Sequence, residues 1–222
     1  MDSGCRLCDV EHRCWSRNPW DRILWESADF LALPTLGAIV EGWLLIVPKD
    51  HYLCAGALQS ELLPELDRFL RSVTHRVERE YGQTAVFEHG PSCVGEPVGC
   101  TVDHAHIHIV PIRHNLMEGA RDLAPRTLQW RRAAGLEDAR DFHMRRLPYL
   151  YVEQPRGIAH IATGPGIPSQ LFRKVVAKFM GVPERYDWRR FPETRNIEAT
   201  IEKLSRNSEG SMRPDVALIA RM

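Results

Sequence analysis

The segment Asp103-His104-Ala105-His106-Ile107-His108-Ile109-Val110-Pro111 determines how the rest of this sequence is interpreted. Polar and apolar residues alternate along it, which is typical of a β-strand with one polar face. In such a strand His104, His106 and His108 lie on the same side, with roughly 6.6 Å between successive rings. Three imidazoles in a row are costly to bury without partners, so the segment is either a polar strand face or a functional site. The interleaved apolar residues and the internal position exclude a purification tag.

The region before this segment is predicted to form an antiparallel sheet with one long helix. Apolar runs predict strands at residues 29–33, 42–47, 84–88 and 104–112. Between the second and third runs, apolar residues recur at helical spacing, and we expect Ser60 to cap this helix and Gly82 to end it. Strands joined by short loops around a single long helix favour an α+β fold.

The last third of the chain is predicted to be folded. Residues 115–145 are rich in Arg and are expected to form a helical or irregular connector, followed by a hairpin of strands at 149–154 and 158–163. A helix capped by Ser169 and a last helix at about 196–204 should complete the chain. This pattern predicts a catalytic domain at 1–114 with an N-terminal arm, and a small α+β extension at 115–222.

The composition excludes several classes of protein. The 222 residues carry 29 basic and 29 acidic side chains, which gives no global electrostatic reason to bind nucleic acid or an anionic membrane. The longest apolar stretch, residues 43–47, is too short to cross a bilayer, and the first thirty residues do not resemble a secretory signal. We therefore expect a cytoplasmic protein, in which the six cysteines serve as metal ligands, catalytic groups or buried thiols.

A possible metal site lies near the N-terminus. The two-residue spacing of Cys5-Arg6-Leu7-Cys8 lets two thiolates share one tetrahedral metal ion, but two more ligands are needed. A local knuckle that also uses His12 and Cys14 is one possibility, and a pair of thiols without metal is another.

The histidine segment resembles the signature of the histidine triad (HIT) family of nucleotide hydrolases and transferases. Residues 42–51, GWLLIVPKDH, are similar to the family's Gly-His-x-apolar-apolar-apolar-Pro-Lys-x-His block. Residues 99–104, GCTVDH, are similar to its Gly-Gln-Ser/Thr-Val-x-His lead-in. An N-terminal Cys-x-x-Cys is found in the zinc-binding branch of the family, so the resemblance covers about residues 5–112.

The resemblance implies a mechanism and a fold. The middle histidine, His106, would attack the α-phosphorus of a nucleotide, and His108 would contact the phosphate oxygens. The near wall of the phosphate site would be formed by Gly99, Cys100 and Thr101. A structural Zn²⁺ would be held by Cys5, Cys8, His51 and His104, and the protein would be a homodimer with a HIT-like fold.

Four residues depart from the family pattern. Trp43 replaces the histidine of the Gly-His block, which would remove a partner of the triad, and Cys100 replaces the glutamine. Glu88 stands where Asn-x-Gly is expected, and Thr35 stands where a ribose-binding Asp is common. Glu88 could line the pocket or serve as a hydrogen-bond partner of the triad strand. These departures indicate that the sugar or the leaving group differs from that of a common purine nucleotide.

The extension offers one candidate anion site. Gln170 and Arg173 lie at the start of the helix that follows Ser169, where backbone N–H groups and an arginine can bind an anion. The alternative is ordinary capping with a solvated arginine.

Three functions are compatible with these features. The first is hydrolysis of a dinucleoside polyphosphate or nucleotide conjugate through a nucleotidyl-histidine intermediate. The second is nucleotidyl transfer or phosphorolysis through the same intermediate. The third is a regulatory module that binds a small-molecule nucleotide without turning it over.

Overall fold

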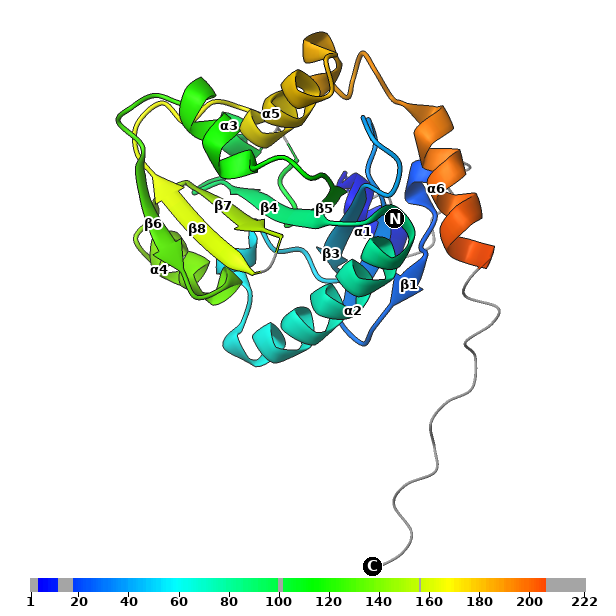
Figure 1. The fold of residues 1–222 in the computed structure, drawn as a ribbon. Coiled ribbons are helices and arrows are strands. Elements are labelled where there is room, and N and C mark those ends of the chain that lie inside the picture. Colours follow the sequence, from blue (N-terminus) through cyan, green and yellow to red (C-terminus); the bar gives the residue numbers. More distant parts are fainter. Residues whose placement is uncertain (1–3, 12–17, 100–101, 156, 207–222) are drawn as a thin grey trace, which may run out of the picture.

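The computed structural model describes residues 4–11, 18–99, 102–155 and 157–206. Within these residues the strands form one eight-stranded antiparallel sheet in the order β1-β2-β3-β5-β4-β7-β8-β6 (Figure 1). The strands are β1 (Trp25–Glu26), β2 (Phe30–Pro34), β3 (Leu44–Pro48), β4 (Thr84–Gly90), β5 (Ile107–Pro111), β6 (Gln129–Ala133), β7 (Tyr149–Gln154) and β8 (Ile158–Thr163). The predicted α+β class with an antiparallel sheet is confirmed.

Helices pack on both faces of this sheet. They are α1 (Arg6–Glu11), α2 (Leu63–Tyr81), α3 (Leu116–Leu123), α4 (Ala139–Met144), α5 (Leu171–Phe179) and α6 (Thr194–Arg206). Short 3-10 turns occupy Pro19–Asp21, Ala55–Ala57, Ser60–Leu62, Pro97–Gly99, Leu136–Asp138 and Pro183–Tyr186. Among the described residues no helix is both long and apolar enough to cross a membrane.

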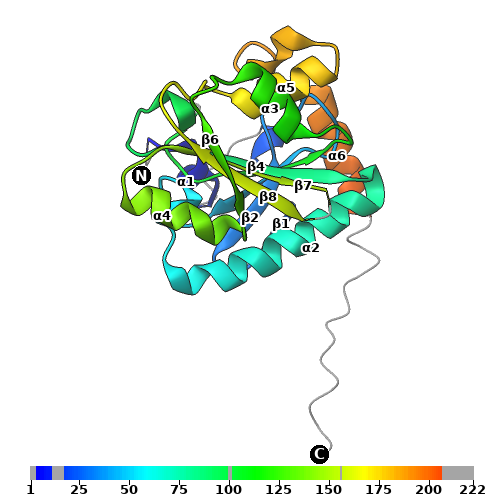
Figure 2. The same cartoon turned by 60° about the vertical axis from the view of Figure 1, so that its left-hand side comes forward.

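One face of the sheet is covered by α2 and α4, as Figure 2 shows from the side. Helix α2 buries an apolar stripe at helical spacing, formed by Leu66, Leu70, Val73 and Val77. This stripe packs on Ile46, Ile107 and Ile109 of the central strands. The triad strand β5 is therefore fixed from behind by the longest helix.

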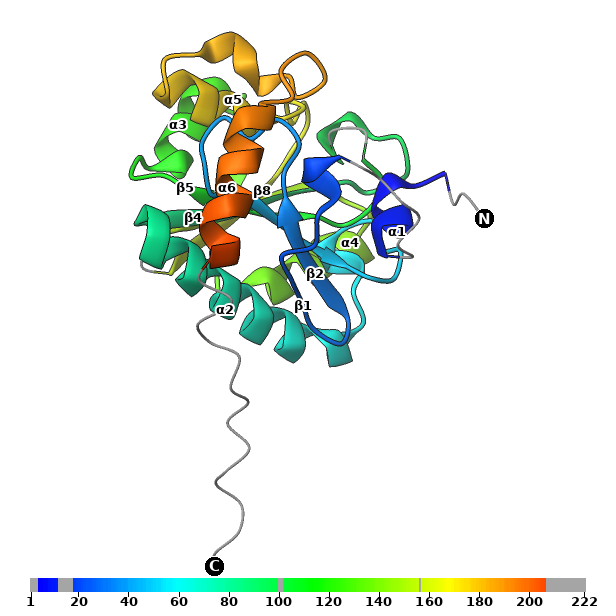
Figure 3. The ribbon, with the colours of Figure 1, turned by 90° about the vertical axis from the view of Figure 1, so that its right-hand side faces the viewer.

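The opposite face is covered by α3 and α5 over β4 and β7, and by α1 over β2 and β3. Helix α6 contributes Ile197 and Ile201 to the same face (Figure 3). The buried Thr200 hydroxyl of α6 accepts a hydrogen bond from the backbone N–H of Gly42 at 2.8 Å and donates to the Asn196 carbonyl at 2.7 Å. Helix α6 is thus tied to the turn that leads into β3.

The C-terminal extension continues the sheet of the first 114 residues. Strand β7 pairs with β4 from Val86↔Glu153 to Gly90↔Tyr149, and β8 and β6 follow it. The predicted hairpin at 149–154 and 158–163 is confirmed, and the extension adds three strands to the edge of the sheet that β4 would otherwise form.

Four local predictions are wrong. The connector at 115–145, expected to be helical or irregular, contains strand β6. Strand β5 begins only at Ile107, so His104 and His106 lie in the segment that leads into the strand. Ser60 opens a 3-10 turn ahead of α2, and no side chain caps that helix. Helix α5 is preceded by Gln170 in the left-handed conformation (φ 58°), so Ser169 is not its cap.

Candidate functional site

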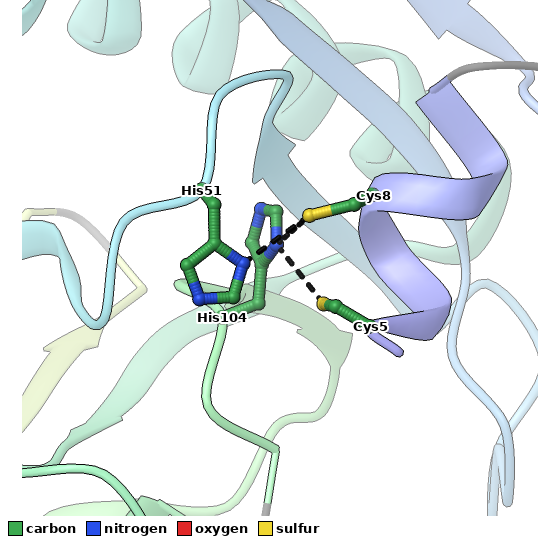
Figure 4. A group of neighbouring side chains, drawn as sticks. All are labelled: Cys5, Cys8, His51 and His104. Carbon is green, nitrogen blue, oxygen red and sulfur yellow. Dashed lines mark hydrogen bonds between the residues drawn. The ribbon is translucent and has the colours of Figure 1, made fainter. Parts of the chain in front are cut away.

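A cluster of two cysteines and two histidines joins the N-terminal arm to the central strands (Figure 4). The Cys8 Sγ lies 3.2 Å from the Nδ1 of His51, and both Cys5 Sγ and Cys8 Sγ lie 3.4 Å from the Nδ1 of His104. One ligand atom from each of the four residues lies within 4.8 Å of the others. These groups can hold a metal ion, as the resemblance implied.

The cluster is built from three separate segments. Cys5 and Cys8 lie at the start of α1, His51 lies in the loop after β3, and His104 lies ahead of β5 (Figure 4). The two histidine loops are joined by a hydrogen bond from the Ala105 N–H to the Tyr52 carbonyl at 2.6 Å. Helix α1 has only six residues, and it buries Leu7 and Val10 against β2 and β3.

The donor atoms fit a tetrahedral metal ion. With metal–sulfur bonds of about 2.3 Å and metal–nitrogen bonds of about 2.0 Å, neighbouring ligand atoms lie about 3.5 Å apart. The measured S···N distances are of this size. The other ring nitrogen of His104, Nε2, lies 2.9 Å from the Pro48 carbonyl oxygen. It donates there, which leaves Nδ1 with the lone pair that a metal requires.

The alternative knuckle requires His12 and Cys14, which lie outside the described residues. The four residues of the cluster form a closed donor set by themselves.

One ring nitrogen of His106 forms a hydrogen bond with the backbone. Its Nδ1 lies 2.7 Å from the carbonyl oxygen of His104, so Nδ1 carries a hydrogen and donates it. The lone pair of the neutral ring is therefore on Nε2. The side chain is buried, and it lines a pocket together with His108.

His108 is held by Trp43, the residue that replaces the family histidine. The indole Nε1 of Trp43 lies 3.0 Å from the Nδ1 of His108 and donates to it. The expectation that Trp43 removes a partner of the triad is therefore wrong. The indole N–H takes the place of the histidine as a hydrogen-bond partner of the triad.

Burial and mutual proximity keep the histidines neutral. Burial lowers the pKa of His106 and lowers that of His108 well below its ordinary value. The nearby Arg173 lowers both further. Burial also lowers the pKa of His104 to about 4 and that of His89, on the adjacent strand β4, to about 3. Neutral imidazoles serve as nucleophiles and as metal ligands.

Arg173 reaches the triad from α5. Its guanidinium donates to the carbonyls of Tyr186 at 3.0 Å and Gly37 at 2.5 Å, and its Cζ lies 4.8 Å from the ring centroid of Trp43. The side chain is buried and lines the same pocket as His106 and His108. Arg173 is thus a buried cation beside the triad, and the alternative of a solvated arginine is wrong.

Two pocket residues were not assigned to the site from the sequence: Arg6 was missed, and Trp188 was expected mainly to pack. Arg6 lies between the cysteines of the metal cluster and is bound to Asp21, and Trp188 follows the 3-10 turn Pro183–Tyr186. Thr35, the fourth departure, also lines the pocket. Arg6 could have been proposed from its position within Cys-x-x-Cys. Trp188 precedes Arg189 and Arg190, and this sequence is compatible both with a packing anchor, which is the favoured interpretation, and with part of an anion-binding surface. The other lining residues are Leu7, Leu36, Leu45 and Val102.

Glu88 lies away from the pocket. Alternation along β4 places Phe87 and His89 on the triad side, and Glu88 on the side of α2 and α4. The Glu88 carboxylate accepts hydrogen bonds from the Ala55 N–H at 2.7 Å and the Tyr149 hydroxyl at 2.5 Å. Of its two predicted roles, the structure supports hydrogen bonding within the fold and does not support substrate contact.

The remaining predicted substrate contacts have different positions. Gln170 is buried at the start of α5 and is not among the pocket-lining residues. Gly99 is buried at the end of the 3-10 turn Pro97–Gly99 and does not line the pocket either. Cys100 and Thr101 lie outside the described residues.

The chain is similar to a described protein family and to a curated plant protein. Residues 26–123 match the family described as "Protein similar to CwfJ C-terminal". Zinc finger CCCH domain-containing protein 64 of Arabidopsis thaliana is 28% identical over 186 residues, which are 78% of this chain and 30% of that protein. The chain thus corresponds to less than a third of the length of this relative.

Solved structures of histidine triad proteins are also similar. A hypothetical histidine triad nucleotide-binding protein from Sulfolobus tokodaii is 20% identical and has a TM-score of 0.40, over 50% of this chain and 70% of its own. A HIT family protein from Bacillus anthracis is 21% identical with a TM-score of 0.42, over 51% and 76%. The triad histidines around β5 thus lie beside the cysteine–histidine cluster, and residues 26–123, which contain His51 and all three triad histidines, match the family of proteins similar to the CwfJ C-terminus.

Proposed function

We propose that this protein is a nucleotide-phosphate hydrolase of the histidine triad type, with His106 as the nucleophile. The observation that carries this proposal is the 2.7 Å hydrogen bond between His106 Nδ1 and the His104 carbonyl. It assigns the lone pair to Nε2, in a pocket that also holds His108 and Arg173. A neutral imidazole with a fixed lone pair beside a buried cation suits attack on an anionic phosphate ester.

The reaction consists of two displacements at phosphorus. The His106 Nε2 lone pair forms a bond to the α-phosphorus, and the bond from phosphorus to the leaving-group oxygen breaks with its electron pair. The leaving group takes up a proton from solvent or from a group in the site. Water then attacks the phosphorus and loses a proton to solvent, the N–P bond breaks with its electron pair returning to Nε2, and the nucleoside monophosphate leaves with His106 neutral again. His108 and Arg173 stabilise the phosphate oxygens during both steps.

Transfer or phosphorolysis is the second candidate. The covalent intermediate is the same, and the acceptor is inorganic phosphate or a second substrate in place of water. Residues of the extension support this candidate, because Arg173 and Trp188 line the pocket and would be available to contact an acceptor.

The test is to trap the intermediate. The protein is incubated with dinucleoside polyphosphates, nucleoside phosphoramidates and nucleotide sugars, then denatured at alkaline pH and analysed by intact mass. A nucleotidyl adduct that disappears after acid treatment supports the proposal, because N–P bonds to imidazole are acid-labile. Added phosphate or sugar phosphate distinguishes hydrolysis from transfer.

The controls separate the three functions. His106→Ala should form no adduct, and His75→Ala on the exposed side of α2 should behave as wild type. An adduct on His106→Ala would show that another residue is the nucleophile. Nucleotide binding without adduct or turnover across the whole panel would support the regulatory module.

We propose further that the metal ion is zinc. Two thiolates and two imidazoles form a Cys₂His₂ set, which zinc favours and which leaves no open position for a substrate. Such an ion would fasten the six-residue helix α1 to the loops that carry His51 and His104, and would thereby hold Arg6 and Leu7 at the pocket.

A further inference from the structure

Trp43 can act only as a hydrogen-bond donor. The indole ring has a single polar atom, the Nε1–H, and this atom lies 3.0 Å from His108 Nδ1. His108 must therefore accept at Nδ1, and the hydrogen of the neutral ring must be on Nε2. A histidine in place of Trp43 could donate or accept and would leave both tautomers of His108 accessible.

The surrounding rings prevent the imidazole ring of His108 from flipping by half a turn. Phe87 stacks on it with ring centroids 4.4 Å apart and an interplanar angle of 16°, and His106 contacts its edge at a centroid distance of 5.2 Å. Trp43 is itself fully buried and packs on Phe87. The donor of the hydrogen bond and the ring that accepts it are thus both fixed by packing.

The charged and titratable groups around His108 also disfavour an imidazolium. His106 on the same segment, His89 on β4 and Arg173 on α5 face it, and each is a cation when protonated. Addition of a proton at Nδ1 would bring two N–H groups against each other at the Trp43 contact. Both geometry and charge therefore keep His108 neutral.

A buried positive charge is nevertheless present, on Arg173. The guanidinium stacks on the same Trp43 indole that binds His108, at 4.8 Å from the ring centroid, and is anchored by the Tyr186 and Gly37 carbonyls. Trp43 thus connects the hydrogen-bonding histidine on β5 with the cation on α5.

We propose that Trp43 is a positioning residue that fixes His108 as a neutral imidazole with its hydrogen on Nε2, and that Arg173 of the C-terminal extension supplies the positive charge that His108 does not carry. The tautomer of His108 follows from its hydrogen bond with Trp43 and does not depend on any substrate. Its use in binding a phosphate group rests on the proposed function. An imidazolium would both donate a hydrogen bond and carry a positive charge. Here His108 on β5 donates the hydrogen bond, and Arg173 on α5 carries the charge.

The tautomer can be measured directly in wild-type protein without substrate. Long-range ¹H–¹⁵N correlation of the histidine rings at pH 7 reports which nitrogen carries the hydrogen. We expect His108 to show a protonated Nε2 and an unprotonated Nδ1, and His106 to show the reverse pattern. A protonated Nδ1 on His108 would overturn the positioning role of Trp43, whether or not the protein turns over any nucleotide.

Removal of the indole donor should release the constraint. In Trp43→Phe we expect the ring signals of His108 to average between the two tautomers, whereas Trp130→Phe, on strand β6, should leave them unchanged. Signals of His108 that are identical in Trp43→Phe and wild type would contradict the proposal. If Trp43→Phe does not fold, the wild-type measurement decides.

The role of Arg173 is tested with inorganic phosphate as the probe. We expect Arg173→Gln to weaken phosphate binding at least tenfold by ³¹P NMR titration, and to leave the His108 tautomer unchanged. Arg76→Gln removes an arginine stacked on a different tryptophan, Trp25, and should bind phosphate as wild type does. Equal phosphate binding by Arg173→Gln and wild type would overturn the role assigned to Arg173. If wild-type protein binds phosphate but forms no nucleotidyl adduct, that result counts against the proposed function only.

Discussion

The hydroxyl of Tyr149 on β7 donates a 2.5 Å hydrogen bond to the carboxylate of Glu88 on β4, across the two strands that join the C-terminal extension to the rest of the sheet. Glu88 is 1% exposed and also accepts from the Ala55 N–H. Burial raises the pKa of Glu88 to about 7, and the two hydrogen bonds oppose this rise. The ionisation of one carboxyl group therefore affects the contact between the two parts of the fold.

The stability of the protein should fall as pH rises because of Glu88. The folded-state pKa of about 7 is above the ordinary value of 4.5, so the folded protein binds the proton more tightly than the unfolded chain does. This contribution is fully present below pH 4.5 and is lost between pH 4.5 and 7. The difference is on the order of 3 kcal/mol.

The isosteric variant Glu88→Gln should remove that pH dependence. Urea unfolding measures the free energy of unfolding of both proteins at pH 4.5 to 8. As pH rises through this window, the free energy of unfolding of wild type should fall relative to that of the variant. The comparison cancels contributions from other titrating groups, which both proteins share. Parallel stability profiles would show that Glu88 titrates normally.

Metal content should depend on residues far apart in the sequence. We expect one metal ion per chain in wild type and none in Cys8→Ser or His51→Ala, measured by plasma mass spectrometry after extensive dialysis. The exposed, unpaired Cys93 supplies the control, because Cys93→Ala should retain the metal. Loss of metal in Cys14→Ala with retention in His51→Ala would indicate the local knuckle instead.

A methyl group at Gly37 should displace Arg173. Gly37 has φ +75°, and a Cβ there would lie 2.6 Å from the Nη2 of Arg173 and 2.5 Å from the Cβ of Trp188. Gly181 has nearly the same φ, +72°, but a Cβ there would meet nothing within 4 Å. We expect thermal unfolding to show a loss of about 1 kcal/mol for Gly181→Ala and about 3 kcal/mol for Gly37→Ala. Equal losses would mean that the crowding around Gly37 relaxes freely.

Two threonine-to-valine substitutions should affect the free energy of unfolding differently. Thr200→Val leaves the buried N–H of Gly42 without its acceptor and should cost about 2 kcal/mol in free energy of unfolding. The buried Thr74 hydroxyl has no hydrogen-bond partner within the described part of the chain, so Thr74→Val should be neutral or stabilising. Denaturant titration measures both, and a large loss in Thr74→Val would show that a bound water satisfies its hydroxyl.

The elements that could be predicted are those whose pattern reflects burial. The hairpin around Pro155 was located correctly because β7 and β8 combine apolar alternation with a turn sequence. Strand β6 was missed because Gln129–Ala133 is a mostly exposed edge strand without an apolar face. The start of β5 was also misplaced, because His104 and His106 alternate like strand residues but are turned towards the metal cluster and their own backbone.

The parts of the candidate site that could be predicted are those whose residues lie close together in the sequence at a characteristic spacing. The two-residue gap between Cys5 and Cys8 and the triad segment are local patterns. The contacts of Trp43 with His108 and Arg173 join three distant segments, and the sequence contains no pattern that relates them. The two roles predicted for Glu88 could not be separated for a related reason, since a shift of one residue along β4 moves a side chain to the other face of the sheet.

The pairing of β4 with β7 determines where this chain can be divided. A fragment that ends at residue 114 would contain the triad and the metal cluster but would expose the backbone N–H and C=O groups of β4 along a new, flat edge beside an uncovered patch formed by Phe87 and Trp43. Exposed edges of this kind pair with other chains and aggregate. A minimal version of this protein is therefore expected to require the hairpin and α5, and we expect the two sequence regions to fold as one cooperative unit.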